Sequence, residues 1–272
     1  MPVAACRQVW REFLRGSRPT GWACKYACCA STSRLDRIAL LISFVIPAHN
    51  EARLLGATLQ SLGEAARLTG EAFELLVVDD ASDDGTAAVA IAGGAQVLRV
   101  EHRHIAATRN AGAAATSGEW LVFVDADTRV NAAVLGAAVQ ALRAGAVGGG
   151  ARVCLQGEVA WHVRAATAFF AWAFRMTGIA PGCFLFCTRA AFEAAGGFNA
   201  SFYAGEDVAL SRALAMHGRF LILREAVHTS ARKLHTFSAW EHLKLVLRFA
   251  WRRQHLLTSR KHLDLWYGKR RD

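Results

Sequence analysis

Short apolar runs alternate along this chain with longer stretches in which apolar residues recur every three or four positions. The apolar runs predict strands buried on both faces, at 40–46, 73–78, 96–100 and 120–124. The periodic stretches predict helices, at 51–68, 105–116 and 130–142. Strands and helices that alternate at this spacing predict β-α-β units and a largely parallel sheet.

The second half of the chain has a mixed pattern. It predicts strands at 151–155, 182–188 and 220–227, and helices at 159–175 and 207–217. No repeat or linker divides the chain, so we expect one α/β domain over 41–235. Residues 1–40 are expected to be a poorly ordered basic extension, and 236–272 a basic amphipathic helix and tail.

Polar residues gather where three of the predicted strands end, at 47–51, 79–84 and 125–127. In parallel sheets, ligands bind outside the carboxyl ends of the strands. Each cluster alone is compatible with ordinary loop chemistry, but three at successive strand ends indicate a binding site at one edge of the sheet.

Charge is distributed unevenly. The chain has a net charge of +10, but residues 43–231 contain 14 basic and 17 acidic side chains. The basic excess therefore belongs to the two ends, which argues against a nucleic-acid-binding domain. No apolar run reaches the roughly 18–20 residues of a membrane helix, and residues 1–40 lack the continuous apolar core that a secretory signal would need. We expect a cytoplasmic protein that could lie on the inner face of the membrane.

The carboxylates of Asp125 and Asp127 follow a buried strand and lie one residue apart. Such a pair can hold Mg²⁺ or Mn²⁺ on substrate phosphates, although it can equally form a solvated Asx turn. Asp79 and Asp80 could accept hydrogen bonds from a nucleobase or ribose. Asp83 and Asp84 are better interpreted as helix-capping residues, and Asp84 also suits a turn.

Several segments together resemble the family 2 glycosyltransferases. They are VIPAHNE at 45–51, VVDDASDDGT at 77–86, RNAG at 109–112, GEW at 118–120 and FVDADT at 123–128, followed by GGF at 196–198 and GEDVAL at 205–210. The resemblance covers about 43–231, and its specificity lies in the order and spacing of motifs that are individually modest. It implies a GT-A, Rossmann-like fold and inverting transfer from a nucleotide-diphosphate sugar.

The resemblance also implies roles for individual residues. Pro47, Asn50 and Glu51 would lie at the nucleotide end, Asp79 and Asp80 at the base or ribose, and Arg109 near the nucleotide. Asp125 would contact ribose and, with Asp127, hold a divalent cation. Asp207 would be the general base, with Glu206 beside it.

The Glu206–Asp207 pair has two interpretations. An inverting transfer needs a carboxylate to take the acceptor's proton, and a neighbouring Glu206 could raise the pKa of that base by like-charge proximity. Alternatively, both carboxylates cap a helix that begins at Val208. The other motifs favour the catalytic interpretation.

The segment after the predicted core is polar and basic. His228, Ser230 and Arg232 could close over the diphosphate as a lid, or belong to a solvated basic loop. Further on, the apolar face and basic face of 240–253 suit either an anionic membrane surface or an ordinary docking helix. Membrane contact would suit a lipid-linked or cell-envelope saccharide acceptor.

Three other functions share some of these features. A phosphatase of the haloacid dehalogenase kind also uses two aspartates after an apolar strand, but it places them on the first strand, and Arg129 stands where Thr or Val is needed. A non-catalytic nucleotide-sugar-binding protein acting with a partner stays open. Nucleic-acid binding is disfavoured by the acidic body.

Overall fold

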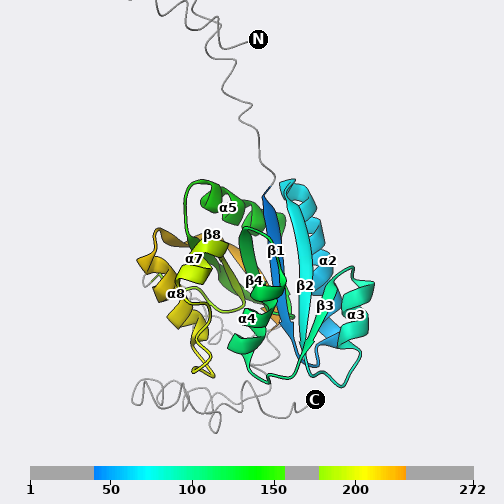
Figure 1. The fold of residues 1–272 in the computed structure, drawn as a ribbon. Helices are drawn as coiled ribbons and strands as arrows, with labels where there is room; N and C mark the ends of the chain where they lie inside the picture. The colour runs from blue at the N-terminus through cyan, green and yellow to red at the C-terminus, as the bar shows by residue number, and fades with distance from the viewer. Residues whose placement is uncertain (1–39, 157–177, 231–272) are drawn as a thin grey trace, which may run out of the picture. The chain divides into compact units, whose positions relative to one another are not determined.

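The computed structural model describes residues 40–156 and 178–230. In these ranges an eight-stranded sheet carries helices on both faces (Figure 1). Its strand order is β3-β2-β1-β4-β7-β6-β8-β5. The strands are β1 (Leu41–Ala48), β2 (Ala72–Asp80), β3 (Gln96–Val100), β4 (Trp120–Val124), β5 (Thr128–Arg129), β6 (Gly148–Gln156), β7 (Phe184–Thr188) and β8 (Phe220–Ser230).

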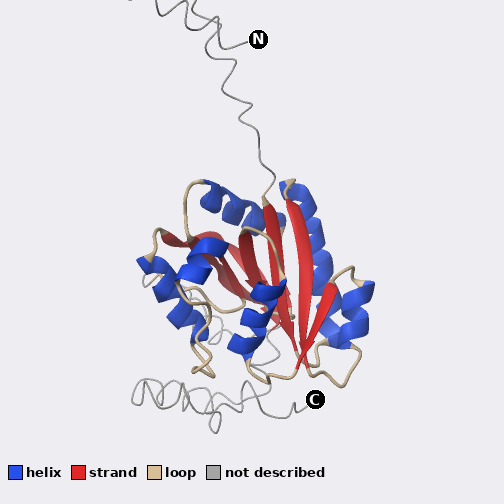
Figure 2. Cartoon of the chain, in the orientation of Figure 1, coloured by secondary structure: helices blue, strands red, loops and turns tan. Residues whose placement is uncertain are grey.

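The helices connect these strands and cover the sheet (Figure 2). They are α2 (Ala52–Thr69), α3 (Thr86–Ala92), α4 (Ile105–Ala115), α5 (Ala132–Arg143), α7 (Arg189–Ala194) and α8 (Glu206–Met216). None of the helices in the described parts of the chain is long and apolar enough to cross a membrane.

Strand β4 shows why the sheet is covered on both faces. Its five residues are all buried. Trp120, Val122 and Val124 pack into one core with α2 and α5, whereas Leu121 and Phe123 pack into a second core with α4, α7 and α8. Alternate side chains of a strand point to opposite faces, so a fully apolar strand requires helices on both sides.

The predicted parallel sheet is confirmed for the first half of the chain. Strands β3, β2, β1 and β4 are parallel neighbours. Strand β7 then pairs antiparallel with β4, and β6 pairs antiparallel with β7. The carboxyl ends of β1, β2 and β4 therefore lie at one edge, as the GT-A expectation requires.

Three short elements were not predicted, namely α3, β5 and α7. They span seven, two and six residues, which is too short for a clear hydrophobic period. The predicted helix at 159–175 and the C-terminal helix and tail at 236–272 lie outside the described residues, as does the extension at 1–39.

Strands β1, β2, β6, β7 and β8 begin or end one to three residues from their predicted boundaries, and two of these differences have a clear structural reason. Strand β1 continues through Pro47 to Ala48, because its pairing with β4 stops at Val45 and a missing N–H is tolerated beside a single neighbour. Strand β6 begins at Gly148 rather than 151. A Cβ on Gly149 would lie 2.2 Å from the Leu221 carbonyl oxygen, so these glycines serve close packing within the sheet.

Candidate active site

Hydrogen bonds join two of the three predicted polar clusters. The Asn50 backbone N–H donates to Ser82 Oγ (3.0 Å), and the Asp83 N–H donates to Asn50 Oδ1 (2.9 Å). The Glu51 N–H donates to Thr86 Oγ1 (2.8 Å). Asn50 has a φ of 54°, a left-handed conformation that asparagine tolerates better than most residues. The loops after β1 and β2 thus form one connected surface.

Asp79 and Asp80 are buried and organise these loops. Asp79 accepts from the Ser82 N–H (3.1 Å). Asp80 accepts from the backbone N–H groups of Arg103 (2.8 Å) and His104 (3.2 Å) and from the Thr108 hydroxyl (2.8 Å), and so positions the start of α4. Their contact with a base or ribose stays a prediction.

Asp84 caps helices, as the sequence indicated. Its Oδ1 accepts from the Thr86 N–H at the start of α3 (2.9 Å), and its Oδ2 accepts from the Ala52 N–H at the start of α2 (3.2 Å). Helix α2 begins after the β1 loop and α3 after the β2 loop, so one carboxylate satisfies a donor of each helix across the two loops. The capping expected of Asp83 is not seen in the described contacts, in which Asp83 contributes its backbone N–H to Asn50.

Arg109 lies between the two carboxylate motifs of the predicted site. Its side chain is 3% exposed. Nη1 donates to Glu206 Oε1, and Nη2 donates to Asp125 Oδ1 and to the Gly182 carbonyl, each at 2.8 Å. The guanidinium also lies 5.2 Å from the centre of the Phe198 ring. Arg109 thus brings the end of β4 and the start of α8 together.

The neighbours of Arg109 on α4 fix this arrangement. Asn110 donates to the Phe198 carbonyl (2.8 Å) and accepts from the Phe198 N–H (2.9 Å), as in a strand pair. A Cβ on Gly112 would lie 2.3 Å from Val45 Cγ1, so only glycine lets α4 approach the sheet this closely. Arg109, Asn110 and Gly112 of the RNAG segment therefore each have a structural role.

Burial raises the pKa of both carboxyls in the Glu206–Asp207 pair. The pKa of Glu206 rises to about 7, because burial and the charge of Asp207 outweigh the attraction of Arg109. The pKa of the half-buried Asp207 is also raised, first by burial and then by Asp125. The expected cause, repulsion from Glu206, is thus not the main one, since loss of water around the carboxylate dominates.

The helix-capping alternative for this pair is only partly seen. Helix α8 begins at Glu206, two residues before the expected start, and its N-cap Gly205 has a left-handed φ of 77°. Asp207 Oδ1 accepts from the adjacent Val208 N–H (2.8 Å), whereas Glu206 is directed to Arg109. Capping therefore leaves the position of Glu206 unexplained.

Replacement of Glu206 by Gln should flatten the pH dependence of stability. Folding raises the pKa of Glu206 from 4.5 to about 7, so the folded chain holds this proton more tightly than the unfolded chain. The resulting stabilisation is present below pH 4.5 and is lost as the pH rises through 7, by about 3 kcal/mol. Urea unfolding of both proteins at pH 5 and pH 7.5 measures this, and an equal pH dependence would contradict it.

Gly182 is a site residue that the sequence did not reveal. Its carbonyl accepts from Arg109, and a Cβ built on it would lie 2.9 Å from Asp207 Oδ2. The Pro181-Gly182 dipeptide signals a turn, but nothing in the sequence shows that the turn touches both carboxylate motifs.

Gly182→Ala should lower the kcat of the sugar transfer that the family resemblance implies, by roughly 10-fold to 100-fold. The new methyl group would displace the Asp207 carboxylate from its position. The backbone at this position is not left-handed, so alanine itself is tolerated there. Steady-state kinetics measure the effect. Gly136→Ala is the matched control, since its Cβ would meet nothing within 4 Å inside α5. Equal kcat in both variants would contradict the proposed crowding of Asp207.

Asp125 and Asp127 suit a hard cation, although they do not enclose one alone. Asp125 keeps a quarter of its side chain exposed, and Asp127 Oδ1 lies 3.4 Å from the donating Thr229 hydroxyl. Among the described residues, no group of three or more His, Cys, Asp or Glu could hold a metal. Two carboxylates that leave coordination positions for substrate phosphates are the usual arrangement for Mg²⁺.

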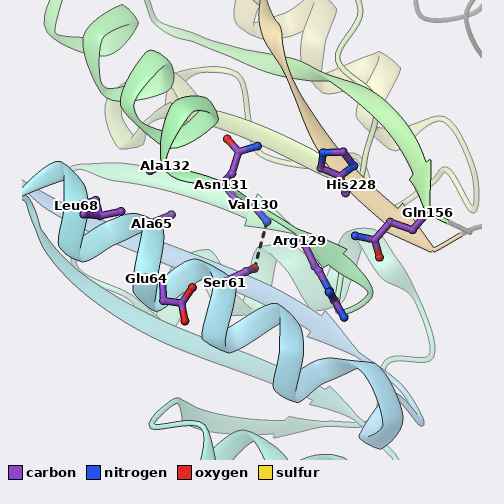
Figure 3. A pocket seen from close by; sticks show the side chains of 10 residues that line it. All are labelled: Ser61, Glu64, Ala65, Leu68, Arg129, Val130, Asn131, Ala132, Gln156 and His228. Carbon is purple, nitrogen blue, oxygen red and sulfur yellow. Dashed lines mark hydrogen bonds between the residues drawn. The ribbon is translucent and has the colours of Figure 1, made fainter.

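The two described residues proposed for a lid, His228 and Ser230, lie two positions apart in strand β8. The Ser230 N–H donates to the Asp127 carbonyl (3.3 Å), which places Ser230 beside the metal motif. His228 instead lines a cavity of about 320 Å³, together with Arg129 and Gln156 (Figure 3). That cavity borders α2 and contains none of the predicted carboxylates. Arg232 lies outside the described residues.

Comparison with known proteins identifies the family. The model of glycosyl transferase family 2 matches residues 43–196, more than half of the chain, so this protein belongs to that family. Glycosyltransferase AglD of Haloferax volcanii is 32% identical over 112 residues, which are 38% of this chain and 18% of AglD.

Solved structures confirm the fold. The structure of S. aureus TarS 1–349 has a TM-score of 0.57 at 18% identity, over 77% of this chain and 66% of that one. The mannosyltransferase PcManGT from Pyrobaculum calidifontis has a TM-score of 0.59 at 22% identity, over 77% and 63%. The fold is therefore the GT-A fold predicted from the motifs. The chain spans just under two thirds of these two structures.

Proposed function

We propose that this protein transfers a sugar from a nucleotide-diphosphate sugar to a hydroxyl acceptor, with inversion and with the help of a divalent cation. One observation carries the proposal. Arg109 contacts both Asp125 of the first carboxylate motif and Glu206 of the second, 2.8 Å from each. The donor-side and acceptor-side motifs therefore meet at one edge of the sheet, where this fold class binds ligands.

The related structures support the donor class. TarS has been solved with UDP-GlcNAc, and PcManGT with GDP-Man and Mn²⁺. A nucleotide in this chain would lie on the connected loops after β1 and β2, with Pro47, Asn50 and Glu51 on one side and Asp79 and Asp80 on the other. The identity of the sugar would depend on contacts that the family does not fix.

Asp207 would act as the general base. It would take the proton of the acceptor hydroxyl as that oxygen attacks the anomeric carbon and the bond to the diphosphate breaks. Burial raises its pKa, which makes the ionised carboxylate a stronger base than a solvated aspartate. Asp125 and Asp127 would hold Mn²⁺ or Mg²⁺, which when bound would stabilise charge on the departing diphosphate.

A panel of nucleotide sugars tests the proposal. Purified full-length protein is incubated with each donor, with and without Mn²⁺ or Mg²⁺, and binding is followed by thermal shift, because a bound donor stabilises the folded chain. We expect at least one donor to raise Tm only when the cation is present, and to be hydrolysed or transferred. A panel without binding, hydrolysis or transfer would overturn the proposal.

The alternative is a nucleotide-sugar-binding protein without activity of its own. It predicts the same thermal shift but no turnover, even with a broad set of saccharide and lipid-linked acceptors. Slow hydrolysis of the donor by the wild-type protein, lost in Asp207→Asn, would exclude this alternative.

The acceptor and the site of action form a separate part of the proposal. We propose a saccharide or lipid-linked acceptor, and contact of the basic segment 236–272 with an anionic membrane surface. Flotation with anionic vesicles of the full chain and of a chain ending at 235 tests this. Equal flotation of the two proteins would contradict the membrane role.

A further inference from the structure

The contacts of Arg109 differ from those expected of a nucleotide-binding arginine. Its side chain is 3% exposed, and both terminal nitrogens already donate to protein oxygens. Nε is buried without a hydrogen-bond partner among the described residues. Three of its five N–H groups therefore donate to protein oxygens, and the guanidinium belongs to a side chain that is almost fully buried.

The partners of Arg109 come from three separate parts of the chain. Asp125 follows β4, Gly182 precedes β7 and Glu206 opens α8, at 16, 73 and 97 residues from Arg109. Gly182 packs against the Asp207 side chain, and Glu206 directly precedes Asp207 in α8. One planar group thus fixes the donor-side carboxylate relative to the segment that carries the general base.

This arrangement depends on the shape of the guanidinium as well as on its charge. A planar group with two terminal nitrogens can bond two carboxylates in fixed directions, whereas a lysine ammonium is a point charge on a flexible stem. Burial adds to the effect, since carboxylates that lose their partner in a dry site move toward water or take up a proton. Loss of the arginine geometry should therefore alter the distance between the two motifs.

Building on the proposed function, we infer that Arg109 is a positioning residue for the transfer reaction. It holds Asp125 and the Glu206–Asp207 turn in one geometry and makes no contact with the nucleotide. The inference replaces the expectation, drawn from the family resemblance, that Arg109 lies at the nucleotide.

Kinetics of Arg109→Lys test this inference. We expect kcat to fall about 100-fold, the size of effect that a displacement of about 1 Å can cause, while the Kd of the donor stays within about threefold. Arg143→Lys is the matched control, because Arg143 pairs with Glu71 away from the carboxylate motifs. A raised Kd with normal kcat would show that Arg109 contacts the nucleotide, and unchanged kcat and Kd would show that it has no positioning role.

A second variant tests the inference independently, in case Arg109→Lys does not fold. Glu206→Asp keeps the negative charge but shortens the side chain by one methylene, so it should break the contact with Arg109 while Asp125 stays paired. As for Arg109→Lys, we expect a reduced kcat and an unchanged donor Kd. Wild-type kcat in Glu206→Asp would overturn the inference.

A measurement without donor separates this inference from the proposed function. Cys183 is surrounded by Asp125, Asp127, Asp207 and Arg109, so alkylation of its thiol reports on the packing between the motifs. Peptide mapping by mass spectrometry should show several-fold faster alkylation of Cys183 in Arg109→Lys than in wild type or Arg143→Lys, with buried Cys187 as internal reference. Equal alkylation rates would contradict the positioning role of Arg109, even if no donor were found. Faster alkylation in a protein that binds no donor would contradict only the proposed function.

Discussion

Asp207→Asn is expected to abolish sugar transfer while leaving donor binding intact. Asparagine has nearly the same shape as aspartate and can still accept from the Val208 N–H, so the start of α8 should be preserved. It cannot take a proton from the acceptor hydroxyl. General-base catalysis contributes about 10² to 10⁴ in rate, and kcat should fall by a factor in this range. Steady-state kinetics give kcat, and thermal shift with donor and cation gives binding.

A surface carboxylate provides the control for this variant. Glu193→Gln makes the same carboxylate-to-amide change on the exposed side of α7, and its kcat should equal that of wild type. Asp207→Asn with near-normal kcat would exclude Asp207 as the base. Loss of both kcat and donor binding would instead assign it to the donor site.

The hydrophobic pattern was sufficient to predict the half of the fold that positions this site. Strand β4 is apolar at every position, so helices on both faces followed from the sequence, and the polar clusters at the strand ends followed from the parallel arrangement. The antiparallel insertion of β7 beside β4 could not be predicted in this way. A buried apolar run of five residues is compatible with parallel and with antiparallel pairing, and only tertiary contacts select between the two.

The contacts between distant segments were not predictable from residue types. Arg109 in RNAG resembled a nucleotide-binding residue, because a basic side chain near a phosphate site suggests a ligand contact. Its buried partners lie up to 97 residues away. Gly182 had no recognisable role, since the need for a bare Cα arises only when Asp207 is packed against it. Both constraints arise from contacts between segments that are distant in sequence, so the local sequence pattern around Arg109 or Gly182 cannot reveal them.

Asp127→Ala should weaken the cation-dependent part of donor binding by about 100-fold, since a carboxylate ligand contributes several kcal/mol to holding a cation on phosphate. The substitution should disturb the loop little. Backbone bonds from Thr128 N–H to the Asp125 carbonyl (3.0 Å) and from Ser230 N–H to the Asp127 carbonyl (3.3 Å) remain available to alanine. The contact of the carboxylate with the Thr229 hydroxyl would be lost.

The measurement is donor Kd with Mn²⁺ and in chelator, for wild type and variant. Wild-type protein should bind far more tightly with the cation, and the variant should bind with nearly the same weak affinity in both conditions. Glu193→Ala is the control, because Glu193 is an exposed carboxylate on α7 that belongs to none of the predicted motifs. A variant that keeps the full effect of Mn²⁺ would rule out Asp127 as a metal ligand. The cation would then depend on Asp125, whose charge is partly balanced by the adjacent Arg109 guanidinium.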